Sequence, residues 1–157
     1  MRPDDDVKLG KLVKKHGYLH DVLNGSGFLK VRWYASLGEL IHGLEKNSFA
    51  VVEYRVWMVV VSSLLIFLCH VWPFIAVWIT TGPTRWLNLA IIAMHCSSYL
   101  MTAWQLRARL WSVVAYPLVF LLMIYIQWRT MVLNYWLGGI RWRDTLYPLK
   151  ELRANRI

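Results

Sequence analysis

The middle of this chain lacks acidic side chains: no Asp or Glu occurs between residues 56 and 128, where only three arginines carry charge. A soluble domain needs charges of both signs on its surface, so this stretch is not the surface of one. The aromatic content of 15% and the many branched aliphatic residues exclude a disordered chain. We therefore expect a mostly α-helical integral membrane protein with a small polar head and a basic tail.

Cysteine is also scarce, because Cys69 and Cys96 are the only two and both lie in apolar segments. Two such residues indicate no disulfide framework, and we interpret them as reduced thiols. Met1 is followed by charged residues rather than an apolar run, so we expect no signal peptide. The chain contains no zinc pattern, no Gly-rich phosphate loop and no Ser/His/Asp arrangement, which removes the commonest catalytic and metal motifs.

Both ends of the chain carry more basic than acidic side chains, and residues 1–55 and 129–157 together contribute six of the nine net positive charges. Basic margins beside apolar spans are typical of cytoplasmic flanks that meet anionic lipid. We expect membrane lipids and not nucleic acid as partners, with the polar head facing the cytoplasm.

The polar and apolar patterns divide the chain into regions. Asp residues at the start and Gly17 at the end predict a helix over residues 4–17, and short strands are expected at 18–22 and 28–31. The four expected regions are a head at 1–32, an amphipathic interfacial helix at 33–50, a membrane region at 51–136 and a basic, aromatic tail at 137–157.

Three apolar segments in the membrane region are long enough to cross a bilayer. They run from about 56 to 79, with Pro73 as an expected kink, from 86 to 106, and from 110 to 128. Three crossings would put the basic tail outside, against the positive-inside rule. We favour a cytoplasmic tail, with one apolar segment re-entrant or lying flat.

Several polar residues invite a chemical interpretation and also allow a simpler one. His70 and His95 lie in apolar segments, where a histidine is a functional hypothesis by default, although His95 can also just hydrogen bond between helices. Asp4, Asp5 and Asp6 can supply a general base or a cation ligand, or only cap a helix. Arg32 beside Trp33 can hold a diphosphate or anchor the chain at the interface.

The order of these pieces adds a resemblance. The segments DDVKLGKLVKKHG at 5–17, RW at 32–33, KNSFA at 46–50 and GGIRWRDTLYPLKELRAN at 138–155 resemble the C-terminal half of membrane-bound family-2 glycosyltransferases, in the ceramide glucosyltransferase-like branch. The resemblance implies that Asp6, beside Asp5, is the catalytic base. It also implies that Arg32 and Trp33 match the RW of a (Q/R)xxRW motif that contacts the donor diphosphate and acceptor. A WR-x-x-x-Y pattern is matched by Trp142, Arg143 and Tyr147.

The same resemblance implies parts that this chain does not contain. Family members have an N-terminal nucleotide-binding half with a DxD motif for a divalent cation, Mg or Mn, so residues 1–32 would be the remnant of a catalytic domain. Leu29 stands where the family has Gln or Arg. We explain the difference by a truncated or mis-started reading frame or a split gene, and we do not expect the chain alone to be active. The alternative is a non-enzymatic membrane anchor or assembly subunit with a lipid-binding basic tail.

Overall fold

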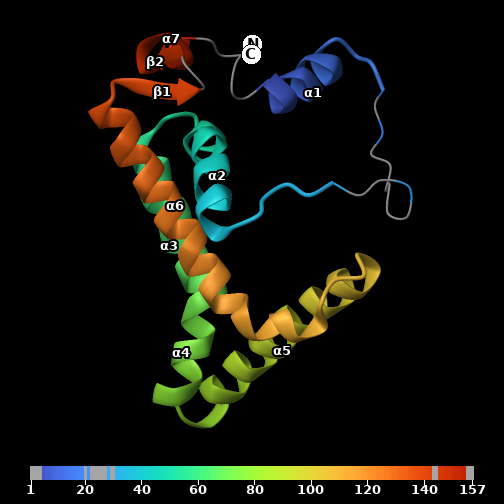
Figure 1. The fold of residues 1–157 in the computed structure, drawn as a ribbon. Coiled ribbons are helices and arrows are strands. Elements are labelled where there is room, and N and C mark those ends of the chain that lie inside the picture. Colours follow the sequence, from blue (N-terminus) through green and yellow to red (C-terminus); the bar gives the residue numbers. More distant parts are fainter. Residues whose placement is uncertain (1–4, 20, 22–27, 29–30, 143–144, 155–157) are drawn as a thin grey trace. The chain divides into compact units, whose positions relative to one another are not determined.

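The structure of the protein is a computed structural model that describes residues 5–19, 21, 28, 31–142 and 145–154. Most of these residues are helical (Figure 1). The chain divides into two compact units, one made of residues 1–59 and 126–157 and the other of residues 60–125. The first unit therefore contains both polar ends of the chain, and the second contains most of the stretch without carboxylates.

The first unit begins with α1 (Asp5–Lys15) and α2 (Leu37–Val51). It continues after the membrane region with the end of α6, the strands β1 (Gly139–Trp142) and β2 (Thr145–Pro148), and α7 (Leu149–Ala154). The strands pair antiparallel from Gly139 opposite Pro148 to Trp142 opposite Thr145. Figure 1 shows this hairpin and α7 at the C-terminal end of α6.

A single hydrophobic core joins the N-terminal and C-terminal parts of this unit. Phe49 of α2 is fully buried there, with Met131 of α6 and Ile140 of β1. The remaining buried members of the core are Val52, Tyr54, Val59, Leu149 and Leu152. The end of α2 and the tail, about 90 residues apart in the sequence, are thus packed together where the apolar helices begin and end.

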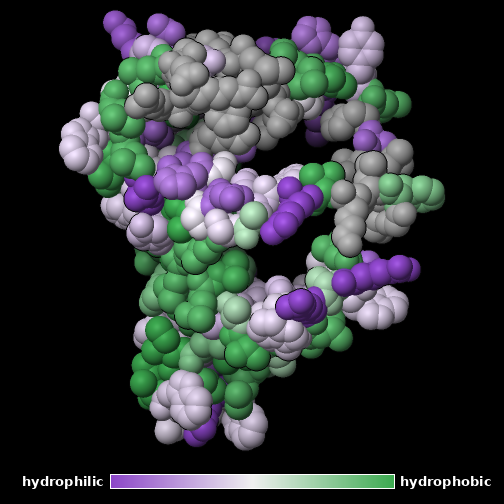
Figure 2. Space-filling model, viewed as in Figure 1, coloured by the Kyte–Doolittle hydropathy of each residue, from purple (hydrophilic) through white to green (hydrophobic). Residues whose placement is uncertain are grey.

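The second unit consists of the helices between these ends. The first apolar segment contains α3 (Val56–Ile66), a π-helical turn η1 (Phe67–Val71) and α4 (Trp72–Ile79). It is followed by α5 (Gly82–Gln105), the 3-10 helix η2 (Leu110–Ala115) and α6 (Tyr116–Trp136). Figure 2 shows apolar side chains covering much of the visible face of these helices. Pro73 is the second residue of α4, one residue beyond Trp72, which follows the π-helical turn, and this agrees with an irregularity at the expected kink.

Two of these segments, Val56–Ile79 and Leu110–Trp136, are long and apolar enough to cross a membrane. The first has the expected bounds, and the second extends beyond the predicted end at residue 128. The helix α5 is long enough, but its hydropathy is reduced by polar residues, which include His95, Ser97, Ser98, Tyr99 and Thr102. The prediction of three spans is therefore matched by two candidates in the described part of the chain.

Other local predictions have mixed outcomes. The helix expected over 4–17 is present as α1, and Gly17 follows it with a positive φ of 78°. The strands expected at 18–22 and 28–31 are wrong for the residues described there, since none of these belongs to a strand. A β-branched or aromatic run needs a partner strand, and the hairpin of this protein is in the tail instead.

Candidate functional site

The carboxylates predicted as catalytic lie at the beginning of α1. Asp5 and Asp6 are its first two residues, where an acidic group suits the positive end of the helix dipole. At its other end Gly17 N donates to Lys14 O at 3.1 Å and Tyr18 N to Val13 O at 3.1 Å, which is a Schellman motif. The position of the Asp pair is as predicted, and the two side chains themselves lie outside the described atoms.

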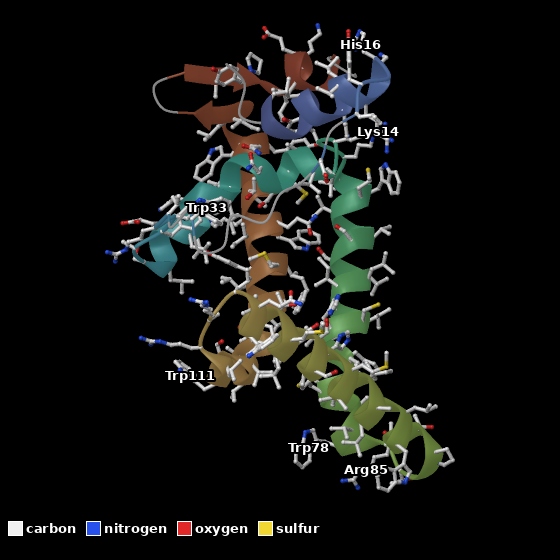
Figure 3. The ribbon with its side chains drawn as sticks, turned by 90° about the vertical axis from the view of Figure 1, so that its right-hand side faces the viewer. Lys14, His16, Trp33, Trp78, Arg85 and Trp111 are labelled. Atoms are coloured by element: carbon white, nitrogen blue, oxygen red, sulfur yellow. The ribbon has the colours of Figure 1, made fainter. Side chains whose placement is uncertain are left out.

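The Arg32–Trp33 pair stands in an extended segment just before α2. Both residues are exposed, and 79% of the surface of Trp33 is accessible. Tyr34 meets Trp33 edge to face with ring centres 6.4 Å apart. A Cβ on Gly43 of α2 would lie 2.2 Å from Cε1 of Tyr34, so the missing side chain at Gly43 makes room for this ring. The Tyr34 ring thereby packs the segment with Arg32 and Trp33 against α2, and Figure 3 shows Trp33 beside that helix.

The start of α2 is held by a reciprocal cap that the sequence analysis missed. The Oγ of Ser36 accepts a hydrogen bond from Glu39 N at 3.2 Å, and Glu39 Oε2 accepts one from Ala35 N at 2.8 Å. The Ser-x-x-Glu spacing at 36–39 is the sequence signal of a capping box, and here the Glu39 carboxylate reaches the N–H of Ala35, one residue before the N-cap. The predicted helix start at 33 is therefore too early, because the cap lets the residues before Ser36 stay extended with Arg32 accessible.

The third predicted group, Trp142, Arg143 and Tyr147, belongs to the hairpin. Tyr147 pairs with Ile140 across the two strands and is half-buried against the core. Trp142 is the last residue of β1, and Arg143 lies outside the described residues. A Cβ on Gly139 would lie 2.2 Å from the carbonyl oxygen of Tyr147, so this strand position has no room for a side chain. The core thus brings the hairpin, with Tyr147 packed against it, to α2.

An ion pair between α2 and α6 also connects the two halves of the first unit. Glu45 Oε1 accepts a hydrogen bond from Arg129 Nε, and the two side chains are 19% and 34% exposed. His42 Nδ1 lies 3.4 Å from the other oxygen of Glu45. From the sequence, Arg129 belongs to the basic margin at 129–157, and its pairing with Glu45 is not predicted. An arginine inside an otherwise apolar helix needs a partner, and that requirement was the available signal.

A histidine cluster, defined here as His70, His95, Tyr116 and Phe120, lies in the second unit. His95 Nε2 donates to the carbonyl oxygen of Cys69 at 3.0 Å, which confirms the expected interhelical hydrogen bond. An α-helical donor to that carbonyl would be the N–H of residue 73, which proline lacks. His95 therefore satisfies a backbone acceptor that Pro73 leaves without its usual partner.

The rest of this cluster is aromatic. His70 Nδ1 lies 2.9 Å from the hydroxyl oxygen of Tyr116, and its ring stacks on Phe120 with centres 4.0 Å apart and an interplanar angle of 3°. The rings of His70 and His95 are 4.9 Å apart. Among the described residues no three His, Cys, Asp or Glu side chains converge on a possible metal position. The cluster is consequently a packing and hydrogen-bonding junction between helices.

No protein-family model, curated protein or solved structure matches this chain.

Proposed function

We propose that this chain is the membrane portion of an inverting glycosyltransferase that moves a sugar from a nucleotide-sugar donor to a lipid-like acceptor at the cytoplasmic face. One observation carries the proposal. The shared core of Phe49, Met131 and Ile140 joins α2 to the hairpin, so the segment with Arg32 and Trp33 and the segment with Tyr147 belong to one unit. An enzyme acting on a lipid acceptor needs polar substrate contacts beside the mouth of an apolar region, and this unit adjoins both apolar segments.

The same core supports a specific membrane topology. The core packs the end of α2 against the hairpin and α7 of the tail, and a packed core cannot lie on both sides of a bilayer. The number of crossings is then even, with Val56–Ile79 and Leu110–Trp136 crossing and α5 re-entrant or lying flat. This arrangement places the basic residues of 1–55 and 129–157 on one side, as the positive-inside rule requires of the cytoplasm.

The proposed chemistry assigns a role to each predicted residue. Asp6 removes the proton of the acceptor hydroxyl as general base, with Asp5 beside it at the positive end of α1. Arg32 stabilises the charge of the departing nucleoside diphosphate, and Trp33 contacts the acceptor. Trp142, Arg143 and Tyr147 of the hairpin region line the substrate path.

Activity is tested after the chain is joined to the genomic sequence that precedes it, or co-expressed with a separate nucleotide-binding half. Sugar transfer from a nucleotide sugar to membrane lipid is measured in isolated membranes. Asp6→Asn is expected to reduce transfer by about 10²- to 10⁴-fold, because a positioned general base contributes that much. Asp21→Asn is the matched control, since Asp21 is another head carboxylate without an assigned role. No transfer with the restored half, or equal transfer by the two variants, rules the proposal out.

The topology has its own test. Cys69 and Cys96 are replaced by Ser, and single cysteines are introduced at Ser36, Thr81 and Lys150 for labelling with a membrane-impermeant maleimide. We expect positions 36 and 150 to be labelled from the cytoplasmic side and position 81 from the other side. If positions 36 and 150 are labelled from opposite sides of the membrane, α5 crosses it. That result contradicts the proposal that both positions lie on the cytoplasmic side.

A non-enzymatic membrane anchor is the second candidate, and the described residues contain one observation in its favour. The hairpin and α7 bury Ile140, Leu149 and Leu152 in a packed core and form a folded cap on α6. A folded cap in a tail that is rich in Lys and Arg suits attachment to lipid or to a partner subunit. This candidate predicts that Asp6→Asn leaves function unchanged while loss of the tail cations releases the partner.

A further inference from the structure

An open cleft lies where α5 ends and the chain turns towards η2. Trp104, Gln105, Arg107, Ala108 and Leu110 form its walls, and its volume is about 570 Å³. All five belong to the second unit, and residues 60–125 contain no Asp or Glu. The guanidinium group of Arg107 therefore has no carboxylate of its own unit with which to pair.

The turn that forms this cleft is a Schellman motif with an unusual residue at its key position. Arg107 N donates to Trp104 O at 3.1 Å, and Ala108 N donates to Ala103 O at 2.8 Å. Arg107 has a φ of +52°, the left-handed conformation in which a side chain is strained and glycine is preferred. The same motif at the end of α1 uses Gly17.

A second left-handed position without glycine shows how such strain is compensated inside this protein. Glu53 has a φ of +51° at the end of α2, where the turn buries Tyr54 in the core and Glu53 pairs with Arg55 at 3.1 Å. Arg107 makes no ion pair with any residue in the described part of the chain, and its turn places no large side chain in a core. Strain that internal contacts do not compensate indicates a ligand-binding role.

The turn is also held rigidly on its far side. Tyr99 of α5 and Ser112 of η2 share a hydrogen bond of 2.8 Å between their hydroxyl oxygens. Ser112 Oγ in turn donates to the backbone carbonyl of Arg109. The two arginines of the turn are thus attached to a fixed backbone, which lowers the entropic cost of binding an anion.

The surroundings of the cleft are apolar and aromatic. Trp104 and Trp111 are 73% and 69% exposed, and Leu110 is also exposed. Figure 3 places Trp111 at this turn. Exposed tryptophans beside arginines at the end of an apolar segment are typical of the headgroup level of a bilayer. A ligand here needs an anionic group for the guanidinium and an apolar part for the rim.

We propose that this cleft binds the phosphate of an anionic phospholipid from the leaflet whose headgroups lie beside Trp104 and Trp111. Arg107 holds the phosphate, Arg109 adds positive potential two residues away, and Trp104 and Leu110 contact the apolar part of the lipid. Guanidinium groups bind phosphate through paired charge-assisted hydrogen bonds. In a zwitterionic headgroup, the positive group of the lipid partly neutralises the charge of the phosphate that the guanidinium would bind. This site is independent of the proposed sugar transfer, which uses the other unit.

The test uses the full chain in phosphatidylcholine nanodiscs that contain a photoactivatable phosphatidylglycerol analogue. Cross-linked peptides are mapped by mass spectrometry. We expect labelling of the peptide around Trp104–Trp111, reduced about tenfold or more by Arg107→Gln because a charge-assisted hydrogen bond contributes that much. Arg107→Lys is expected to reduce it less, because lysine keeps the charge but not the paired hydrogen bonds. Arg55→Gln is the matched control, since Arg55 already pairs with Glu53.

Competition identifies the source of the phosphate. Unlabelled phosphatidylglycerol is expected to displace the label, whereas phosphatidylcholine and inorganic phosphate at the same concentration are not. Equal labelling of the Arg107→Gln and Arg55→Gln variants overturns the proposal, as does labelling confined to the tail. Displacement by inorganic phosphate as effective as by the lipid overturns the assignment to a phospholipid.

Discussion

The ion pair between Glu45 and Arg129 leads to the most direct test of how the first unit is held together. Glu45→Gln keeps the size of the side chain and removes its charge. The pair is partly buried, with 19% of the glutamate and 34% of the arginine side chain exposed. Surface pairs contribute at most about 1 kcal/mol, whereas removing one partner of a fully buried pair costs about 3–5 kcal/mol. An intermediate loss of about 2 kcal/mol in the free energy of unfolding is expected here.

A matched control exists in the same unit. Glu53 and Arg55 form an ion pair at 3.1 Å, and their side chains are 56% and 37% exposed. Glu53→Gln is therefore expected to change the free energy of unfolding by about 0.5 kcal/mol or less. The comparison separates the effect of burial from that of charge removal, because both substitutions are the same chemical change.

Unfolding is measured in mixed micelles with increasing dodecyl sulfate and followed by tryptophan fluorescence. The variants are Glu45→Gln, Arg129→Gln, the double variant and the control. We expect the double variant to lose about 1–2 kcal/mol less than the sum of the single losses, since each single change leaves a charge unpaired. Additive losses, or a loss for Glu45→Gln no larger than that of the control, would refute the reasoning.

Three further substitutions test the packing of the two units in the same unfolding assay. Gly139→Ala is expected to cost at least about 2 kcal/mol, because its Cβ would lie 2.2 Å from the backbone oxygen of Tyr147; a neutral result contradicts the strand pairing. Phe49→Ala should cost about 3–5 kcal/mol, because its side chain is fully buried in the core that joins α2 and the tail. His95→Ala should cost about 1 kcal/mol, and less in a Pro73→Ala background, where the backbone donor is restored; equal costs in both backgrounds argue against the bond to Cys69.

Local sequence signals predicted the helices well where the pattern was strong. The Asp residues and Gly17 bound α1 correctly, because capping and a left-handed stop depend on the residues of the helix end alone. The first apolar segment likewise has its predicted bounds of 56–79. The interhelical role of His95 was also predicted, since a histidine in an apolar segment needs a hydrogen-bond partner.

The predictions failed where a partner from elsewhere in the chain decides the outcome. The apolar runs at 18–22 and 28–31 resemble strands, but no described residue there is in one. Residues 139–142 and 145–148 form the hairpin instead, because each supplies the other's backbone hydrogen bonds. The hydropathy of α5 similarly does not decide whether this helix crosses the membrane. The residue pattern of one helix does not determine on which side of the membrane each of its ends lies.

Composition alone determined that this is a helical chain with an apolar, carboxylate-free middle and basic margins, because transfer of residues from water to lipid depends on residue type and segment length. Only the tertiary structure decided that α2 and the tail share one core and that Glu45 pairs with Arg129. It likewise revealed the strained turn at Arg107. These features depend on contacts between residues far apart in the sequence or on a backbone conformation stabilised by its surroundings, and neither is encoded in a local pattern.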